Sequence, residues 1–221
     1  MLPNPASEPL NQQSLVHAVT LLAEGDPHLA EVLQSYGPPP LWAREPGFAT
    51  LLYIILEQQV SLASARAAYM RLASAIVPIT PEGFLQLDDA TLKQIGFSHQ
   101  KTGYGRILAR AVLDGALDLA ALPGLDDDAV RASLTKIKGI GRWTADIYLM
   151  EALLRPDVWP AGDLALAIAV QRVKRLPALP GPEELRAIGE AYRPWRAAAA
   201  RMFWHHYLSV PIRKNGTSSA K

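Results

Sequence analysis

Apolar residues recur at helical spacing along almost the whole chain, and the alternation that is typical of strands is nearly absent. Glycine and proline interrupt the pattern at short intervals, most firmly at Gly37-Pro38-Pro39-Pro40. Segments of this kind bury their apolar faces by packing helix against helix. We therefore predict an all-α protein.

The apolar spacing and the helix-capping residues divide the chain into short helices. The predicted helices cover residues 14–23, 27–35, 48–60, 62–76, 90–95, 101–113, 127–134, 142–154, 164–175, 182–190 and 195–208. No long linker separates them, so we expect residues 1–221 to form a single two-lobed unit.

We expect one lobe to combine residues 1–60 with residues 163–210 and the other to hold residues 61–162. The polar stretch 213–221 is predicted to be a flexible tail.

Composition excludes several classes of chemistry. The chain has 221 residues, of which 49% are hydrophobic, and it contains no cysteine. Disulfides, thiolate-bound zinc, iron–sulfur clusters and thiol catalysis are therefore excluded. The first residues lack the features of a signal peptide, and no apolar run is long enough to span a membrane. We expect a cytoplasmic protein that makes no contact with membranes.

Charge is distributed unevenly along the chain. Residues 1–98 have a net charge of −5 and residues 99–221 a net charge of +6, which together give the overall +1. The second half is thus the half that would face an anionic partner. Ordinary solvated helix faces also produce such asymmetry, and from charge alone they are its commoner origin.

A basic turn with two glycines leads directly into the helix predicted from residue 142. Gly139 and Gly141 permit a tight turn, and the amides of Gly139, Gly141 and Arg142 would point towards a bound anion. Lys136 and Lys138 add positive charge beside them. Such a turn also occurs as a simple connection between two helices, but its charge and position favour phosphate binding.

A single carboxylate follows a proline-containing loop, Trp159-Pro160-Ala161-Gly162. Asp163 precedes an alanine- and leucine-rich helix and has the pattern of an N-cap residue. The pattern alone favours the N-cap role over a catalytic one. The two roles are compatible, because N–H donors at a helix N-terminus favour an ionised carboxylate.

The segment 137–145 resembles the helix-hairpin-helix signature of base-excision DNA glycosylases, hydrophobic-x-Gly-hydrophobic-Gly-x-x-Thr-Ala. In that superfamily a catalytic aspartate follows the hairpin after a short proline-containing loop, and Asp163 stands 22 positions after Gly141. The resemblance implies a two-lobed helical fold in which Asp163 stabilises the positive charge that develops on the sugar.

Members of the superfamily that also cleave the DNA backbone carry a lysine two residues after the second glycine, where this chain has Trp143. The resemblance therefore implies a monofunctional enzyme that uses water as the nucleophile and has no lyase activity. The sequence Gly-Arg-Trp-Thr-Ala is most similar to that of the 3-methyladenine DNA glycosylase II family. Only 56 residues precede Glu57, so we expect the N-terminal β-rich domain of that family to be missing or reduced.

The resemblance also implies a base pocket and a wedge that enters the DNA. Trp204 matches the tryptophan that stacks on the extruded base, and Trp143, Ile147 and Tyr148 are expected beside it. Residues 57–61 resemble the segment that fills the gap in the DNA. This assigns DNA contacts to Gln58, Gln59 and Ser61, with Gln59 at the wedge position, which is leucine in the best-known relative.

The expected substrate is double-stranded DNA that carries an alkylated base of the 3-methyladenine or 7-methylguanine type, excised in base excision repair. No cofactor is required, but relatives bind a monovalent cation through hairpin carbonyls. The carbonyls of Thr135, Ile137 and Ile140 match these positions and would hold Na⁺ or K⁺. We expect the protein to act as a monomer.

Three other interpretations of the sequence remain open. The protein could excise another class of lesion, or it could be a non-catalytic helix-hairpin-helix module that only grips duplex DNA. An all-α adaptor for other proteins is the third, and the salt dependence of DNA binding would distinguish it from the others.

Overall fold

The computed structural model describes residues 8–210, which form helices and turns and contain no strand. In this range the prediction of an all-α protein is confirmed, whereas the tail predicted at residues 213–221 lies outside it. The helices are α1 (Gln12–Gly25), α2 (Pro27–Tyr36), α3 (Phe48–Glu57), α4 (Leu62–Ala75), α5 (Pro81–Gln86), α6 (Asp89–Ile95), α7 (His99–Leu113), η1 (Leu122–Gly124), α8 (Asp127–Thr135), α9 (Arg142–Glu151), α10 (Leu164–Lys174), α11 (Pro182–Glu190) and α12 (Arg196–Ser209). Within the same range, every helix is too short or too polar to cross a membrane.

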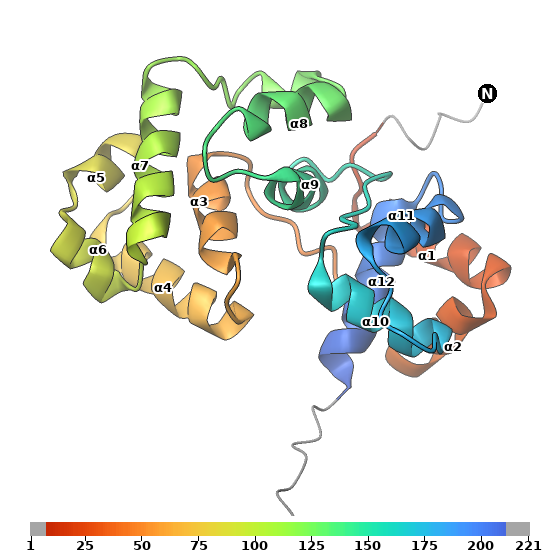
Figure 1. Cartoon of the computed structure of the whole chain (residues 1–221). Coiled ribbons are helices and arrows are strands. Elements are labelled where there is room, and N and C mark those ends of the chain that lie inside the picture. The colour runs from red at the N-terminus through yellow and green to blue at the C-terminus, as the bar shows by residue number, and fades with distance from the viewer. Residues whose placement is uncertain (1–7, 211–221) are drawn as a thin grey trace, which may run out of the picture.

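The helices gather into two lobes (Figure 1). One lobe contains α1, α2, α10, α11 and α12, where α12 packs against α10, α2 and α1. The other contains α3 to α9. The chain thus leaves the first lobe after α2 and returns to it at α10, which brings distant segments together.

Helix α3 corrects the predicted boundary between the lobes. It packs against α4, α7 and α9, so it belongs to the second lobe and not with residues 1–47. Eight of its ten residues are buried. A helix that is apolar on nearly all sides needs neighbours all round, and α4, α7 and α9 provide them. The first lobe therefore ends before Phe48 and not at residue 60.

Two predicted helices end earlier than the apolar pattern indicated. Helix α3 ends at Glu57 because the chain turns at Gln58 and Gln59, where Gln59 has a positive φ of 57°. Helix α9 ends at Glu151, shortly before Leu154, which also has a positive φ. The short helix α5 was not predicted, although Thr80 caps it and Pro81 occupies its first turn.

A fully buried arginine joins the two lobes. The Arg201 guanidinium on α12 donates to the carbonyls of Ala197 in its own helix, Met150 in α9 and Leu41 in the segment before α3. Burial lowers the pKa of Arg201 to about 10, so the group stays charged at neutral pH. Removing this side chain would take a donor from the Leu41 and Met150 carbonyls in the interior, whereas Ala197 lies one helical turn before Arg201 and keeps a backbone donor.

Candidate active site between the lobes

Asp163 lies at the N-terminus of α10 and accepts three hydrogen bonds. Its Oδ1 accepts from the Leu166 amide at 2.6 Å and from Trp204 Nε1 at 3.0 Å. Its Oδ2 accepts from Trp143 Nε1 at 2.8 Å. All three partners are N–H donors, which an acceptor-only carboxylate satisfies together. Asp163 thus caps the helix as predicted, and two indole rings fix its orientation.

Trp143 and Trp204 reach this carboxylate from different lobes. Trp143 is in the first turn of α9, whereas Trp204 is in α12. Both rings are half-buried, so part of each indole remains accessible beside the carboxylate. The structure therefore brings together three residues that the sequence placed in one site.

The two other predicted pocket residues lie in the core. Ile147 is 3% exposed, and Tyr148 is fully buried with its hydroxyl accepting a hydrogen bond from the Gly47 amide at 3.0 Å. Tyr148 is consequently not a wall of the pocket, which corrects its predicted role. Neighbouring residues of a helix point about 100° apart. Tyr148 therefore points away from the direction of Ile147, towards the segment before α3.

The hairpin between α8 and α9 presents positive charge to solvent. Lys136, Lys138 and Arg142 are exposed, whereas Ile137 and Ile140 are buried and anchor the turn. Helix α9 begins at Arg142, and Gly141, its N-cap residue, provides no side-chain cap. The amides of its first turn are therefore available to an anion, with the positive end of the helix dipole behind them.

A buried ion pair holds the two helices of the hairpin together. Asp146 on α9 is 2% exposed and accepts from Arg131 Nε on α8 at 2.6 Å. Burial raises the pKa of Asp146, and the adjacent Arg131 opposes that rise. Arg142 Nε lies 3.7 Å from the second oxygen of Asp146.

Gln58 is half-buried and supports the hairpin through its side-chain amide, while its predicted contact with DNA stays a prediction. Its Nε2 donates to the Gly139 carbonyl at 2.9 Å and to Thr144 Oγ1 at 3.0 Å. Gln59 follows it in an exposed turn, and Ser61 caps α4 through the Ser64 amide. The predicted wedge position is thus the exposed tip of a turn whose base is bonded to the hairpin.

Lys101 on α7 fixes the same turn and was not predicted. Its Nζ donates to the carbonyls of Leu56 and Gln58, both at 2.7 Å. These bonds satisfy carbonyls at the C-terminus of α3, where a cation also complements the helix dipole. Nothing in the local sequence distinguishes Lys101 from a solvated lysine, because its partners are more than 40 residues away.

Comparisons with known proteins agree with this geometry. Residues 52–194 match the family model described as HhH-GPD superfamily base excision DNA repair protein. The chain belongs to this superfamily.

Sequence relatives of this HhH-GPD protein cover most of its length. DNA-3-methyladenine glycosylase 1 of Schizosaccharomyces pombe is 29% identical over 188 residues, which are 83% of this chain and 82% of that protein. YfjP of Bacillus subtilis is 27% identical over 184 residues, and the match spans 80% of this chain but only 64% of YfjP.

Solved structures confirm the helix-hairpin-helix glycosylase fold. The 3-methyladenine DNA glycosylase of Schizosaccharomyces pombe, in complex with abasic DNA, superimposes with a TM-score of 0.79 at 28% identity. The match covers 85% of this chain and 95% of that one. A DNA-3-methyladenine glycosidase from Bacillus halodurans gives a TM-score of 0.70 at 29% identity, covering 87% and 89% of the two chains.

The HhH-GPD chain also contains a buried charge network that the sequence did not reveal. Arg44 donates two hydrogen bonds to the Glu57 carboxylate, at 2.7 and 3.1 Å, and its Nε lies 2.7 Å from Glu151 Oε2. The guanidinium also lies 4.4 Å from the ring centre of Tyr53. One arginine therefore balances two carboxylates, one at the end of α3 and one at the end of α9.

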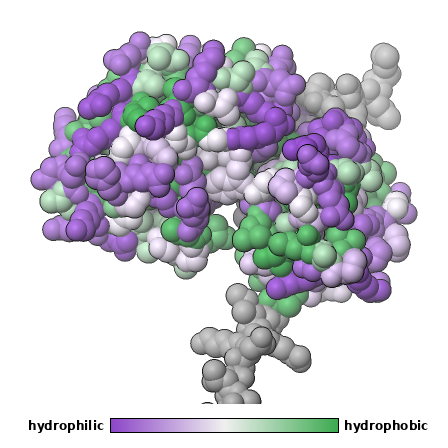
Figure 2. Space-filling model, in the orientation of Figure 1, coloured by the Kyte–Doolittle hydropathy of each residue, from purple (hydrophilic) through white to green (hydrophobic). Residues whose placement is uncertain are grey.

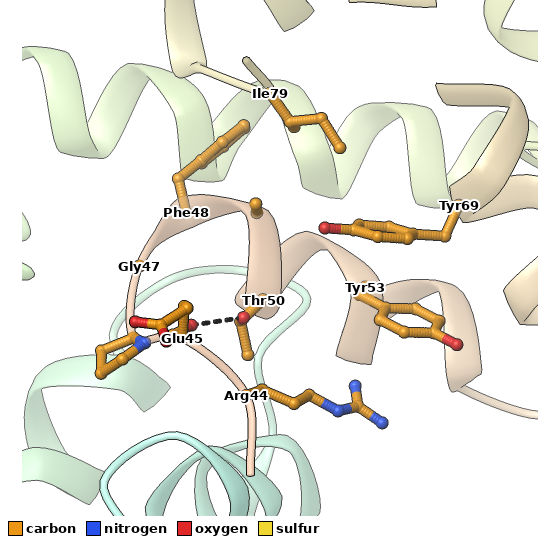
Figure 3. A pocket seen from close by; sticks show the side chains of 10 residues that line it. Arg44, Glu45, Gly47, Phe48, Thr50, Tyr53, Tyr69 and Ile79 are labelled. Atoms are coloured by element: carbon orange, nitrogen blue, oxygen red, sulfur yellow. Dashed lines mark hydrogen bonds between the residues drawn. The ribbon is translucent and has the colours of Figure 1, made fainter. Parts of the chain in front are cut away.

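A cavity of about 490 Å³ adjoins this network (Figure 3). Tyr53 and Tyr69 stack at 4.3 Å along it, with Arg44 below them and Phe48 and Ile79 above. Asp163 is not among the lining residues. The cavity is therefore separate from the carboxylate site, and none of the sequence-predicted site residues borders it.

Glu151 should make stability depend on pH near neutrality. Burial raises the pKa of Glu151 from 4.5 to about 7, against the opposing charge of Arg44. Between these pH values the folded protein retains a proton that the unfolded chain releases, so the stability contribution falls as pH rises.

Relative to Glu151→Gln, which cannot titrate, the wild-type free energy of unfolding should fall by up to about 3 kcal/mol across this window. Urea unfolding of both proteins at about pH 5 and about pH 7.5 measures the difference. A difference that stays constant would mean that Glu151 is ionised throughout.

Gly139 should tolerate no side chain. Its φ is 99°, and a Cβ there would run into the ring of Tyr104. We expect Gly139→Ala to lower the free energy of unfolding by about 2 kcal/mol, from backbone strain and overpacking together. Gly141→Ala is the matched control, since open space surrounds that position and its φ is an ordinary −91°. Equal effects in denaturant unfolding would contradict this account of the hairpin.

Proposed function

We propose that this chain is a monofunctional DNA glycosylase that extrudes an alkylated base from double-stranded DNA and hydrolyses its N-glycosidic bond. The observation that carries the proposal is the Asp163 carboxylate, which two indole N–H groups hold in place beside accessible aromatic surface. The named activities of the Schizosaccharomyces pombe and Bacillus halodurans relatives support the same class of substrate.

The reaction needs little more than this set of groups. As the bond between sugar and base breaks, its electron pair leaves with the base and the sugar becomes positively charged. A fixed carboxylate stabilises that charge, and water then adds to the sugar carbon and releases a proton to solvent. An alkylated purine is already cationic, so it departs without a protonating acid. The indoles of Trp143 and Trp204 favour a cationic base beside Asp163.

Trp143 supports hydrolysis without strand cleavage. It stands where lyase members carry a lysine, and its ring nitrogen donates to Asp163 at 2.8 Å. The lone pair of an indole nitrogen is part of the aromatic ring and is not available to attack the sugar, so no Schiff base forms at this position. Water is accordingly the nucleophile in our proposal.

The remaining residues would hold the DNA. The basic hairpin and the uncapped start of α9 suit a backbone phosphate, and the exposed turn at Gln59 suits the gap that base flipping leaves. Leu164, directly after Asp163, is 64% exposed. Apolar side chains also gather on the surface of the lobe that contains α10 and α12 (Figure 2).

We also propose that a monovalent cation binds the hairpin. Carbonyl oxygens suit Na⁺ or K⁺, and Thr135, Ile137 and Ile140 lie at the turn between α8 and α9. The Ile137 carbonyl already accepts from the Ile140 amide at 3.0 Å, and its second lone pair remains for a cation. Such an ion would add positive charge beside the bound phosphate.

The proposed function is tested with single-lesion duplexes. The protein is incubated with duplexes that carry 3-methyladenine, 7-methylguanine, hypoxanthine or 8-oxoguanine, and strand breaks are scored with and without alkali. We expect breaks at the alkylated bases only after alkali treatment. Breaks without alkali would mean lyase activity, breaks only at 8-oxoguanine another lesion class, and no breaks with tight DNA binding a non-catalytic module.

The positive charge of the hairpin should make DNA binding more sensitive to salt. Replacing Lys136, Lys138 and Arg142 together with glutamine should reduce the slope of log K against log salt by about 3, because each phosphate contact releases about one counterion. Fluorescence anisotropy with an abasic duplex over a range of salt concentrations measures this slope. An unchanged slope would remove the hairpin from the DNA interface.

A further inference from the structure

Trp42 lies in the segment between α2 and α3 and has an unusual backbone conformation. Its φ is 50°, in the left-handed region that bulky residues rarely adopt. Hydrogen bonds fix the chain on both sides. Arg201 Nε donates to the Leu41 carbonyl at 2.9 Å, and the Arg44 amide donates to the Glu151 carbonyl at 2.8 Å. Strain that neighbouring bonds maintain in this way is typical of functional sites.

The conformation places the Trp42 indole in a row of aromatic rings that leads to Asp163. Its ring centre is 6.5 Å from that of Trp204, at an angle of 66°. It also lies 6.5 Å from the ring of His205, the residue after Trp204 in α12. Since Trp204 donates directly to Asp163, Trp42 is one ring removed from the carboxylate.

Two indoles at this angle form a corner with two aromatic surfaces. Trp42 is half-buried, as is Trp204, so each leaves part of its ring accessible. A flat base that stacks on one ring meets the other at its margin. Aromatic rings attract cations through their electron-rich faces, which favours a positively charged purine over a neutral one.

We propose that Trp42 is a further base-contacting residue, which binds the extruded cationic purine together with Trp204. The inference rests on the proposed glycosylase function and adds a residue to the same site. The segment before α3 thereby contributes to substrate recognition, and this role explains why a strained conformation is retained at a tryptophan.

Three variants separate base contact from simple packing. Trp42→Leu keeps apolar bulk but removes the aromatic face, whereas Trp42→Phe keeps an aromatic face. Tyr36→Leu is the matched control, because Tyr36 packs edge-on against His205 at the far end of the same row. Each protein is tested for single-turnover excision of 7-methylguanine, for its Kd on an abasic duplex, and for its unfolding midpoint in urea.

We expect Trp42→Leu to reduce the single-turnover rate on 7-methylguanine about tenfold, the scale of one base–aromatic contact. Its Kd for the abasic duplex should stay within about twofold, since no base occupies the corner there. Trp42→Phe should recover most of the rate, and Tyr36→Leu should leave both quantities unchanged.

Two results would overturn the inference. An unchanged rate in Trp42→Leu would show that the ring does not contact the base. A loss of rate with an equal loss of abasic-duplex affinity, matched by Tyr36→Leu, would reduce Trp42 to a packing residue. If the wild-type protein excises no lesion, the proposed function fails, which is a separate result from either of these.

Discussion

Replacing Asp163 with asparagine is expected to lower the single-turnover rate of base excision by about 10²–10³-fold, because the substitution removes the negative charge that stabilises the developing positive sugar. The asparagine oxygen can still accept from the Leu166 amide and Trp204 Nε1, so the cap of α10 is retained. Single-turnover excision from a 7-methylguanine duplex measures the effect.

The structure adds a stability cost to this substitution. Trp143 Nε1 donates to the second carboxylate oxygen, and the amide group of asparagine would set a donor against that donor. We expect the free energy of unfolding to fall by about 1–3 kcal/mol. The double variant Asp163→Asn, Trp143→Phe removes the conflict and should regain part of the stability without regaining activity.

Asp126→Asn is the control for Asp163→Asn, because Asp126 caps α8 through the Ala129 amide in the same manner. It should leave excision unchanged. Retained excision in Asp163→Asn would refute the catalytic assignment and leave Asp163 as a helix cap alone.

Replacing Arg44 with methionine is expected to lower the free energy of unfolding by about 3–5 kcal/mol, the cost of leaving buried carboxylates without their partner. The side chains of Glu57 and Glu151 are only 6% and 13% exposed. The variant would also lose the contact between the guanidinium and Tyr53. Urea unfolding at neutral pH measures the loss.

The loss in Arg44→Met should shrink as pH falls, because Glu151, whose pKa burial raises to about 7, then takes up a proton and no longer needs a charged partner. Arg175→Met is the matched control. Arg175 forms an ion pair with Glu31 at 2.8 Å, a distance similar to the 2.7 Å of the Arg44 pairs, but both side chains are more than 60% exposed. Exposed pairs contribute about 0–1 kcal/mol. Equal losses of unfolding free energy in the two variants would show that burial does not increase the contribution of Arg44 to stability.

Most helices were predicted from the sequence because their signals are local. Ser61, Asp88, Asp126 and Asp163 each accept a backbone hydrogen bond as the N-cap of the helix that follows. The hairpin was predicted for the same reason, since Gly139 needs a positive φ and Gly141 opens a helix. Capping and glycine conformation depend on a few neighbouring residues.

Errors arose where distant packing decides the outcome. The apolar pattern extends past Glu57, but the helix ends there, where Lys101 Nζ donates to the carbonyls of Leu56 in α3 and of Gln58 just after it. Tyr148 is an aromatic residue of the kind that lines base pockets, yet its hydroxyl accepts a hydrogen bond from the amide of Gly47, 101 positions away. Propensity gives no information about such partners.

The sequence by itself determined the helices, the basic hairpin and the carboxylate after the proline loop, because spacing and capping are local properties. Only the tertiary structure decided that Trp143 and Trp204, from separate lobes, both bond to Asp163, and that Trp42 lies beside Trp204. The chain leaves one lobe and returns to it, so these contacts join residues that are far apart in sequence. Local sequence patterns do not indicate that such residues are close in space. The helices that hold the site are thus encoded locally, whereas the site is completed by packing of the two lobes.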